Sequence, residues 1–194
     1  MKQFVTGLVL AALTALVNVA DAAPVAVSLP ANFSLQAYTG TAAVNAGLLD
    51  ADGVLWTVQE QARDGLQSWY LFFDPLNASR LRATVNFGAP IVAVYTTSAE
   101  LAATQAEWSV DIDGDGQWND YAAHRLMGLE GADTVNWAFG GTALTLDWRA
   151  SDPGDHVRVL LWQPQDQAVP EPASAALALL GLGLAGALRR RTAR

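Results

Sequence analysis

Residues 81–88 read LRATVNFG, and this stretch decides the fold class. Apolar side chains at positions 81, 83, 85 and 87 alternate with Arg82, Thr84 and Asn86. A period of two is typical of a β-strand with one face in the core and one in water, whereas a helix repeats every 3.6 residues. We therefore predict a half-buried strand that ends at the Gly-Ala-Pro of residues 88–90.

The sequence on either side of this strand repeats the same kind of signal. Aromatic and β-branched runs bounded by turn residues predict further strands at GVLWTVQEQ (53–61), LQSWYLFFD (66–74), PIVAVYTT (90–97), NWAFGGTALTLDW (136–148) and DHVRVLLWQ (155–163). The fourth run reads as two strands around Gly140-Gly141. Only SAELAATQAEW (98–108) looks helical. Seven or eight short strands predict an all-β chain with a single antiparallel β-sandwich domain, jelly-roll-like, and one short helix.

The N-terminal 22 residues have the pattern of a secretory signal peptide. Lys2 precedes an apolar core from Phe4 to Val19, and an Ala-x-Ala site at Ala20 and Ala22 places the mature start at Ala23. A retained anchor helix is the alternative, but the apolar run is short and a cleavage site follows it. We expect export across the inner membrane through the Sec translocon.

The C-terminal end carries a second targeting pattern. We expect a sandwich domain over 23–163, a spacer over 164–168 and a sorting segment over 169–194. In that segment an uncharged apolar run, 173–188, would form a helix about 24 Å long, short for a bilayer core of about 30 Å. Arginines follow at 189, 190, 191 and 194, and positive charge stays on the cytoplasmic side. The domain would therefore lie outside, transiently anchored by this hydrophobic, transmembrane helix.

The tail has Val169-Pro170-Glu171-Pro172, then the apolar run, and then Arg189, Arg190 and Arg191. The tail as a whole resembles the PEP-CTERM sorting signal of Gram-negative bacteria. The resemblance implies processing by an exosortase near Pro-Glu-Pro. It also implies delivery to the outer surface or the extracellular matrix of exopolysaccharide-producing, biofilm- or floc-forming cells. A simple membrane anchor is the alternative. VNFGAPIVAVYTTSAELAAT (85–104), RLMGLEGADTVNW (125–137) and LTLDWRASDPGDHVRVL (144–160) further resemble an uncharacterised group of PEP-CTERM β-domains.

Charge and cysteine content exclude several classes of function. Between Ala23 and Pro172 there are six basic and eighteen acidic residues, a formal charge of −12. Such a domain repels the phosphates of nucleic acids and suits divalent cations or neutral ligands better. The 194-residue chain has no cysteine, which excludes thiol catalysis, thiolate zinc sites and disulfides.

One stretch, DIDGDGQWND (111–120), has the spacing of a calcium loop. Carboxylates at positions 1, 3 and 5 precede a glycine at 6, and the oxygens of calcium ligands would come from Asp111, Asp113, Asp115, Gln117 (its carbonyl), Asn119 and Asp120. Position 12 is Ala122, where an EF-hand has Glu, so Asp120 or a returning Glu130 would have to substitute. We expect bound calcium with a structural role. A solvated, empty turn is the alternative.

No nucleophile elbow, zinc motif or phosphate loop appears, and we expect a non-enzymatic module. Most of the seven tryptophans should pack in the core, and Trp118 in the acidic loop is the candidate for stacking on a sugar ring. The expected partner is matrix polysaccharide or protein. The alternatives are an extracellular polysaccharide-active enzyme, with a pair of carboxylates, and a purely structural matrix protein.

Overall fold

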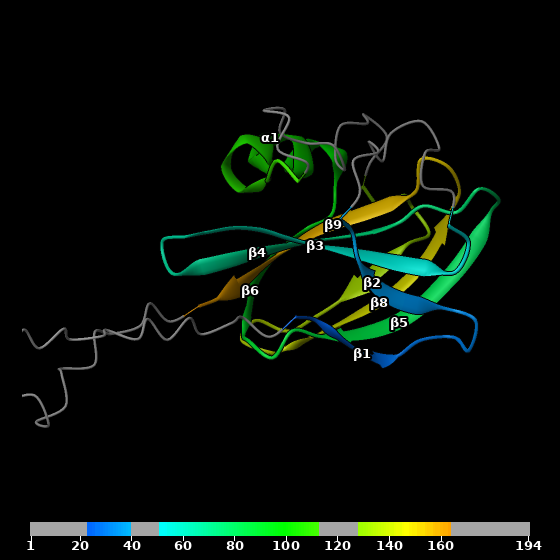
Figure 1. The fold of residues 1–194 in the computed structure, drawn as a ribbon, viewed down its shortest axis with the longest axis horizontal. Coiled ribbons are helices and arrows are strands. Elements are labelled where there is room, and N and C mark those ends of the chain that lie inside the picture. The colour runs from blue at the N-terminus through cyan, green and yellow to red at the C-terminus, as the bar shows by residue number, and fades with distance from the viewer. Residues whose placement is uncertain (1–22, 40–50, 113–127, 164–194) are drawn as a thin grey trace, which may run out of the picture.

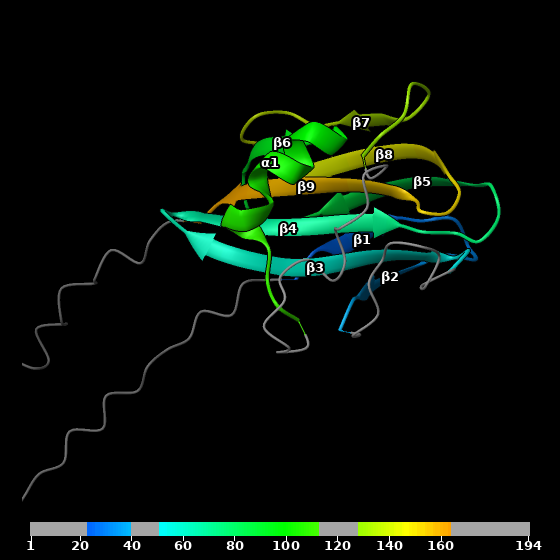
Figure 2. The same cartoon turned by 90° about the horizontal axis from the view of Figure 1, so that it is seen from above.

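The computed structural model describes residues 23–39, 51–112 and 128–163, and these form two packed β-sheets with one helix (Figures 1 and 2). The four-stranded sheet contains, in spatial order, β1 (Val25–Ser28), β5 (Ser79–Asn86), β8 (Ala143–Ala150) and β7 (Thr134–Asn136). The five-stranded sheet contains β2 (Ser34–Ala37), β3 (Val54–Arg63), β4 (Leu66–Phe73), β9 (Asp155–Trp162) and β6 (Ile91–Tyr95). The prediction of a single all-β sandwich is confirmed.

The main core lies between the sheets and follows the alternation seen in the sequence. In β5, Leu81, Ala83 and Val85 are buried, while Arg80 and Arg82 are exposed. β5 pairs with β8 in register from Ser79↔Ala150 to Asn86↔Ala143, so β8 repeats the pattern with its own inward side chains. The fully buried Trp148 and the inward residues of β4 and β9 complete this core.

The helix α1 (Ser98–Trp108) begins and ends where the sequence predicted. Thr97 caps its first turn, since its hydroxyl accepts from the backbone of Glu100 while the Glu100 carboxylate accepts from the backbone of Thr97. Such a capping box satisfies two amides that would otherwise lack partners. The helix lies over the outer face of the five-stranded sheet (Figure 1).

Because α1 covers that face, strands β4 and β9 are buried on both sides. A second apolar cluster forms under the cover, with Leu101 of the helix against Tyr38, Val58, Tyr70 and Phe72. An antiparallel sheet usually keeps one face wet. Here the helix removes that wet face along two neighbouring strands.

The N-terminal strands were not predicted. β1 and β2 are four residues each, VAVS and SLQA, and too short to show a clear period. β2 pairs with β3 in parallel, from Ser34↔Val54 to Ala37↔Thr57, so the five-stranded sheet is mixed rather than purely antiparallel. The described chain thus has nine strands where seven or eight were expected. Two strands flank Gly140-Gly141 as predicted, but the first, β7, ends at Asn136, earlier than the predicted run, and the second is β8.

Candidate functional site

The acidic stretch at 111–120 starts from the covered face of the five-stranded sheet. After α1, the Ser109 hydroxyl and amide both donate to the carbonyl of Gln105, at 2.7 and 3.0 Å. Val110 and Ile112 then pack against the second apolar cluster. Asp111 is therefore the half-buried first residue of the candidate loop, on a backbone anchored on both sides.

The other predicted calcium ligands, Asp113, Asp115, Gln117, Asn119 and Asp120, lie outside the described residues, and so does Trp118. Their ligand roles remain predictions. Within 23–39, 51–112 and 128–163, no three His, Asp or Glu side chains are grouped so that they could hold a metal ion. Glu130, considered as a distant substitute ligand, has its amide bonded to Asp133 at 3.2 Å.

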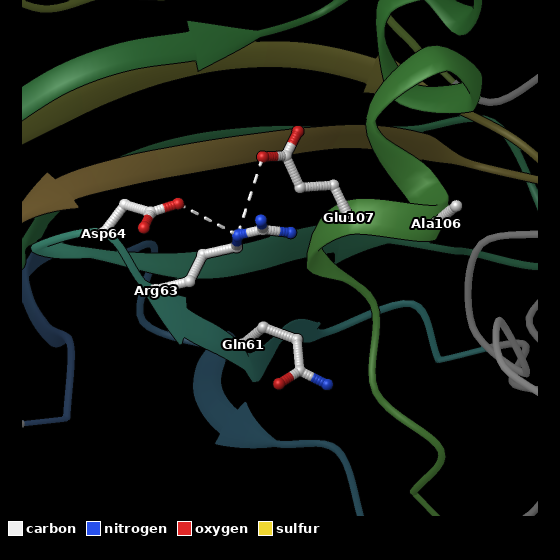
Figure 3. A pocket seen from close by; sticks show the side chains of 5 residues that line it. All are labelled: Gln61, Arg63, Asp64, Ala106 and Glu107. Carbon is white, nitrogen blue, oxygen red and sulfur yellow. Dashed lines mark hydrogen bonds and ion pairs between the residues drawn. The ribbon is translucent and has the colours of Figure 1, made fainter.

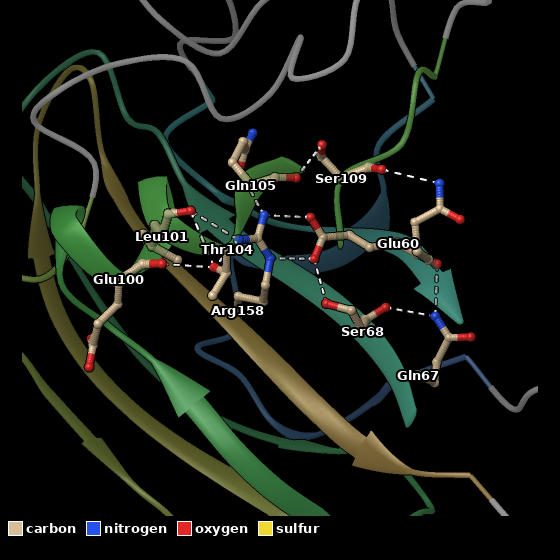
Figure 4. A network of polar contacts seen from close by, with 10 residues as sticks. Glu60, Gln67, Ser68, Glu100, Leu101, Thr104, Gln105, Ser109 and Arg158 are labelled. Carbon is tan, nitrogen blue, oxygen red and sulfur yellow. Dashed lines mark hydrogen bonds and ion pairs between the residues drawn. The ribbon is translucent and has the colours of Figure 1, made fainter. Parts of the chain in front are cut away.

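The strongest polar cluster in the described chain is a buried ion pair under α1 (Figure 4). Arg158 of β9 donates to Glu60 of β3 through Nε at 2.6 Å and Nη2 at 2.8 Å. Both side chains are fully buried. The guanidinium also lies over the ring of Tyr70, with Cζ 5.1 Å from the ring centroid. Burial raises the pKa of the Tyr70 hydroxyl far above its usual range, so this residue stays neutral.

The remaining donors of Arg158 bind the helix. Nη1 donates to the carbonyl of Leu101 at 3.1 Å and to the hydroxyl of Thr104, and Nη2 donates to Oε1 of Gln105 at 2.7 Å. An arginine has five N–H groups, and all five are used here. Ser68 adds a hydrogen bond to Oε2 of Glu60. The cluster joins β3, β4, β9 and α1, and its arginine has no donor left for a ligand.

Sequence reasoning missed this cluster. Arg158 stands alone in an apolar strand, DHVRVLLW, and alternation places it on the face opposite Val157 and Val159. The pattern of this strand alone does not show that α1 covers that face. The signal that could have found the cluster is Glu60, the one charged residue in the predicted strand 53–61, together with the helix predicted between the two strands in the sequence.

A surface depression lies between the end of β3 and the end of α1, lined by Gln61, Arg63, Asp64, Ala106 and Glu107 (Figure 3). Nε of Arg63 is 3.3 Å from Oδ2 of Asp64 and 3.8 Å from Oε1 of Glu107. About half of the Arg63 and Glu107 side chains is exposed. Exposed pairs of this kind add little stability and are easily displaced by water. The depression is an open, polar surface.

A titratable group lies at the other end of the sandwich, where β9 begins. Burial and the negative charges of Asp133 and Glu130 raise the pKa of Asp155 to about 7. Its Oδ2 is buried and has no hydrogen-bond partner among the described residues. The neighbouring His156 is also buried, 3.0 Å from the carbonyl of Pro153 through Nε2 and stacked on Phe72. Asp155 therefore holds a proton close to neutral pH.

Comparison with known proteins settles the nature of the C-terminal segment. Residues 168–191 match the PEP-CTERM protein-sorting motif. This chain carries a PEP-CTERM sorting signal. No curated protein and no solved structure matches the chain. The match spans the predicted signal residues Val169 to Pro172 and Arg189 to Arg191, all of which lie outside the described part of the structure.

The PEP-CTERM motif supports an exported protein that is anchored transiently in the membrane and processed by an exosortase. The apolar run that would form the anchor lies beyond the described residues. Among residues 23–39, 51–112 and 128–163, no helix is both long and apolar enough to cross a membrane.

Proposed function

We propose that this PEP-CTERM chain is a non-enzymatic module, stabilised by calcium, that binds matrix polysaccharide or protein after an exosortase has sorted it to the outer surface or extracellular matrix. The observation that carries the proposal is the sorting motif at residues 168–191. A chain with this signal works outside the cell. There, neutral polysaccharide and millimolar calcium suit a segment with a charge of −12 over residues 23–172.

The buried cluster supports a structural or binding role for the domain. Arg158 and Glu60 are saturated by contacts with one another, with Ser68 and with α1. A charge pair that has lost all contact with water specifies how the helix seats on the sheet. This is the most elaborate polar arrangement in the described chain, and it serves the fold.

The anchoring of Asp111 supports the calcium part of the proposal. Val110 and Ile112 are packed on either side of it, so a cation held by Asp111, Asp113 and Asp115 would bind carboxylates whose first member is already positioned. Without a cation, three carboxylates at alternate positions would repel one another. Calcium would therefore order this loop next to the helix cover.

Asp155 favours a second candidate, an enzyme that cleaves polysaccharide. A carboxyl group whose pKa lies near 7 has the protonation state that a general acid needs. Asp133 and Glu130 are the neighbouring carboxylates that a hydrolase would need as its second group. Asp155 is only 3% exposed, however, and this burial favours the binding module over the enzyme.

The proposed function is tested by retention of the exosortase-processed protein on immobilised exopolysaccharide in calcium and in EDTA. We expect retention in calcium, its loss in EDTA and its loss on Trp118→Ala. Trp162→Ala is the matched control, because this tryptophan is half exposed but belongs to β9 and not to residues 111–120, and the variant should be retained. Lack of retention of the unchanged protein would refute the binding module. Release of reducing ends, abolished by Asp155→Asn, would instead establish the enzyme.

A further inference from the structure

Exposed apolar side chains gather at one end of the sandwich. Six large hydrophobic residues are exposed in the described chain, and four of them lie at the end where β9 finishes: Val25, Trp137, Phe139 and Trp162, which are 63, 37, 80 and 51% exposed. Val27 follows along β1. The sixth, Leu76, is 58% exposed and lies in the turn between β4 and β5, at the opposite end. We call the end where β9 finishes, with Val25, Trp137, Phe139 and Trp162, the exit pole.

Backbone hydrogen bonds bring the parts of the exit pole together. The amide of Trp162 donates to Pro90, and that of Gln163 donates to Gly65 in the β3–β4 hairpin. Ile91 in turn exchanges hydrogen bonds with the β7–β8 turn, accepting from Gly140 at 2.8 Å and donating to Gly141 at 2.7 Å. The hairpin, the end of β9 and this turn share one end in both views, on the left of Figures 1 and 2.

The aromatic tip at the exit pole is held firmly. Phe139 lies in a turn closed by a hydrogen bond from Gly141 to the carbonyl of Ala138, at 2.9 Å. Gly140 has a φ of +77°, which a residue with a side chain rarely adopts, so glycine is suited to this turn. Gly140 and Gly141 are also both hydrogen-bonded to the backbone of Ile91. The turn therefore presents Phe139, the most exposed aromatic ring of the described chain, on a backbone that is bonded to the sheet. Such exposed, clustered apolar groups mark interaction surfaces.

The sequence brings this pole close to a membrane. Gln163 is the last described residue, and only nine residues, 164–172, separate it from the apolar run that starts at Ala173. Nine residues span at most about 30 Å even when fully extended. Because the sorting motif supports a transient membrane anchor, the exit pole is the end of the domain nearest the bilayer while the tail is still attached.

We propose that the exit pole docks on the lipid headgroup region of the membrane for as long as the chain keeps its C-terminal tail. Tryptophan and other aromatic rings favour this interface because an apolar body and a polar edge are both satisfied there. The charged side chains that line the nearby depression include Arg63, which is paired with Asp64 and Glu107. The domain is acidic overall, so docking should be stronger on zwitterionic than on anionic lipid. This inference rests on membrane anchoring and not on polysaccharide binding.

The absence of cysteine allows a direct test with single labels. Phe139→Cys places an environment-sensitive fluorophore at the exit pole, and Leu76→Cys is the matched control, since this residue is also exposed and apolar but lies at the far end. The uncleaved chain is inserted through its tail into vesicles of phosphatidylcholine and phosphatidylethanolamine without exosortase. We expect the label at 139 to shift its emission to the blue and to lose fluorescence to nitroxide-bearing headgroups. The label at 76 should behave as in water.

A second variant separates docking from mere nearness. Adding Trp137→Ser and Trp162→Ser to the Phe139→Cys chain should return the label to a water-like spectrum, since the rings that hold the pole on the lipid are gone. Replacing half of the lipid with phosphatidylglycerol should weaken the quenching. Equal spectra at 139 and 76, quenching that survives the loss of both tryptophans, or a blue shift in the processed protein without vesicles would each overturn the proposal. Retention on polysaccharide would be unaffected by any of these outcomes.

Discussion

At the scale of single residues, Arg158 decides how the outer face of the five-stranded sheet is closed. Its guanidinium bonds two strands and the helix at once, and neither it nor Glu60 contacts water. Two buried charges are costly to remove from water, and their mutual attraction offsets this cost only while both are present. The net contribution of the intact pair to stability is therefore small, but the loss of one partner should be strongly destabilising.

Arg158→Met should lower the free energy of unfolding by about 3–5 kcal/mol, because it leaves the Glu60 carboxylate buried without its partner. Guanidinium chloride unfolding measures the change. Arg80→Met is the control, since Arg80 is paired with Asp147 on the exposed face and its loss should change stability little. The double variant Arg158→Met, Glu60→Leu should recover part of the loss. Equal losses of stability in Arg158→Met and Arg80→Met would contradict the role of burial.

Asp155 should make stability depend on pH. Its pKa is about 7 in the folded protein and about 3.9 in the unfolded chain. The unfolded chain therefore gives up this proton near pH 4, whereas the folded protein keeps it until about pH 7. The stabilisation of the folded state by this proton is complete below pH 4 and is lost as pH rises through 7.

We expect the contribution to be on the order of 2 kcal/mol, after a discount for the solvent screening of the exposed Glu130 and the half-buried Asp133. Urea unfolding at intervals between pH 4 and 8 measures it, and Asp155→Asn should flatten the profile over that range. A variant with the same slope as the unchanged protein would show that another group is responsible.

At the scale of elements, α1 acts as the cover of β9 and β4, and its first turn is fixed by the Thr97–Glu100 capping box. Thr97→Ala should cost about 1 kcal/mol, because the amide of Glu100 loses its side-chain partner. Thr97→Ser keeps the hydroxyl and should retain most of the stability. Hydrogen exchange at the amides of Leu101 and Gln105 should be faster in Thr97→Ala than in Thr97→Ser. Identical exchange rates in the two variants would contradict the role of the cap.

The elements also show what alternation can and cannot predict. It predicted β5 and its neighbour β8 because each is eight residues long, enough to show the period, and the outer face of β5 is wet. It failed for β1 and β2, which are four residues each and are set by pairing with β5 and β3. It also cannot show that Arg158 is buried, since whether the outer face of β9 meets water depends on where α1 lies, and a periodic pattern carries no information on that.

At the scale of the whole molecule, the two predicted functional segments differ in kind. The sorting signal could be predicted because an exosortase reads a linear order of Pro-Glu-Pro, apolar run and arginines, and the motif match confirms it. The calcium loop stays a prediction, since its ligands from Asp113 to Asp120 lie outside the described residues. The exit pole could not be predicted, because it exists only where turns distant in sequence meet.

Calcium should stabilise the whole domain if the loop is a site. In a thermal melt of the processed protein, millimolar calcium should raise the midpoint over that in EDTA by about 2–4 °C, which corresponds to about 1 kcal/mol at weak affinity. Asp113→Ala should abolish the shift. Asp64→Asn, an exposed carboxylate at the β3–β4 turn, is the control and should leave the shift intact. Equal midpoints in calcium and EDTA would make residues 111–120 a solvated turn.

Replacing Pro170-Glu171-Pro172 with three alanines should leave an unprocessed form in the membrane, because the exosortase loses its recognition sequence while the apolar run and the arginines remain. Fractionation of cells followed by immunoblotting measures the ratio of long to short forms. Replacing Gln163-Pro164-Gln165 with alanines, just upstream of the motif, is the control and should be processed normally. Release of the first variant at the usual rate would refute exosortase processing at this motif.

The place of β9 in its sheet has a mechanical consequence. A cell-surface protein held by its C-terminal end carries any drag from flowing water through the strand that leads to that end. Here this strand is β9, which lies between β4 and β6 and is hydrogen-bonded on both sides. An edge strand can be peeled away one bond at a time, but tension on β9 must break ladders on two sides together. While the tail anchors the chain, a pull on it would therefore load a strand that is paired on both sides, and not the short edge strand β1 at the N-terminal end.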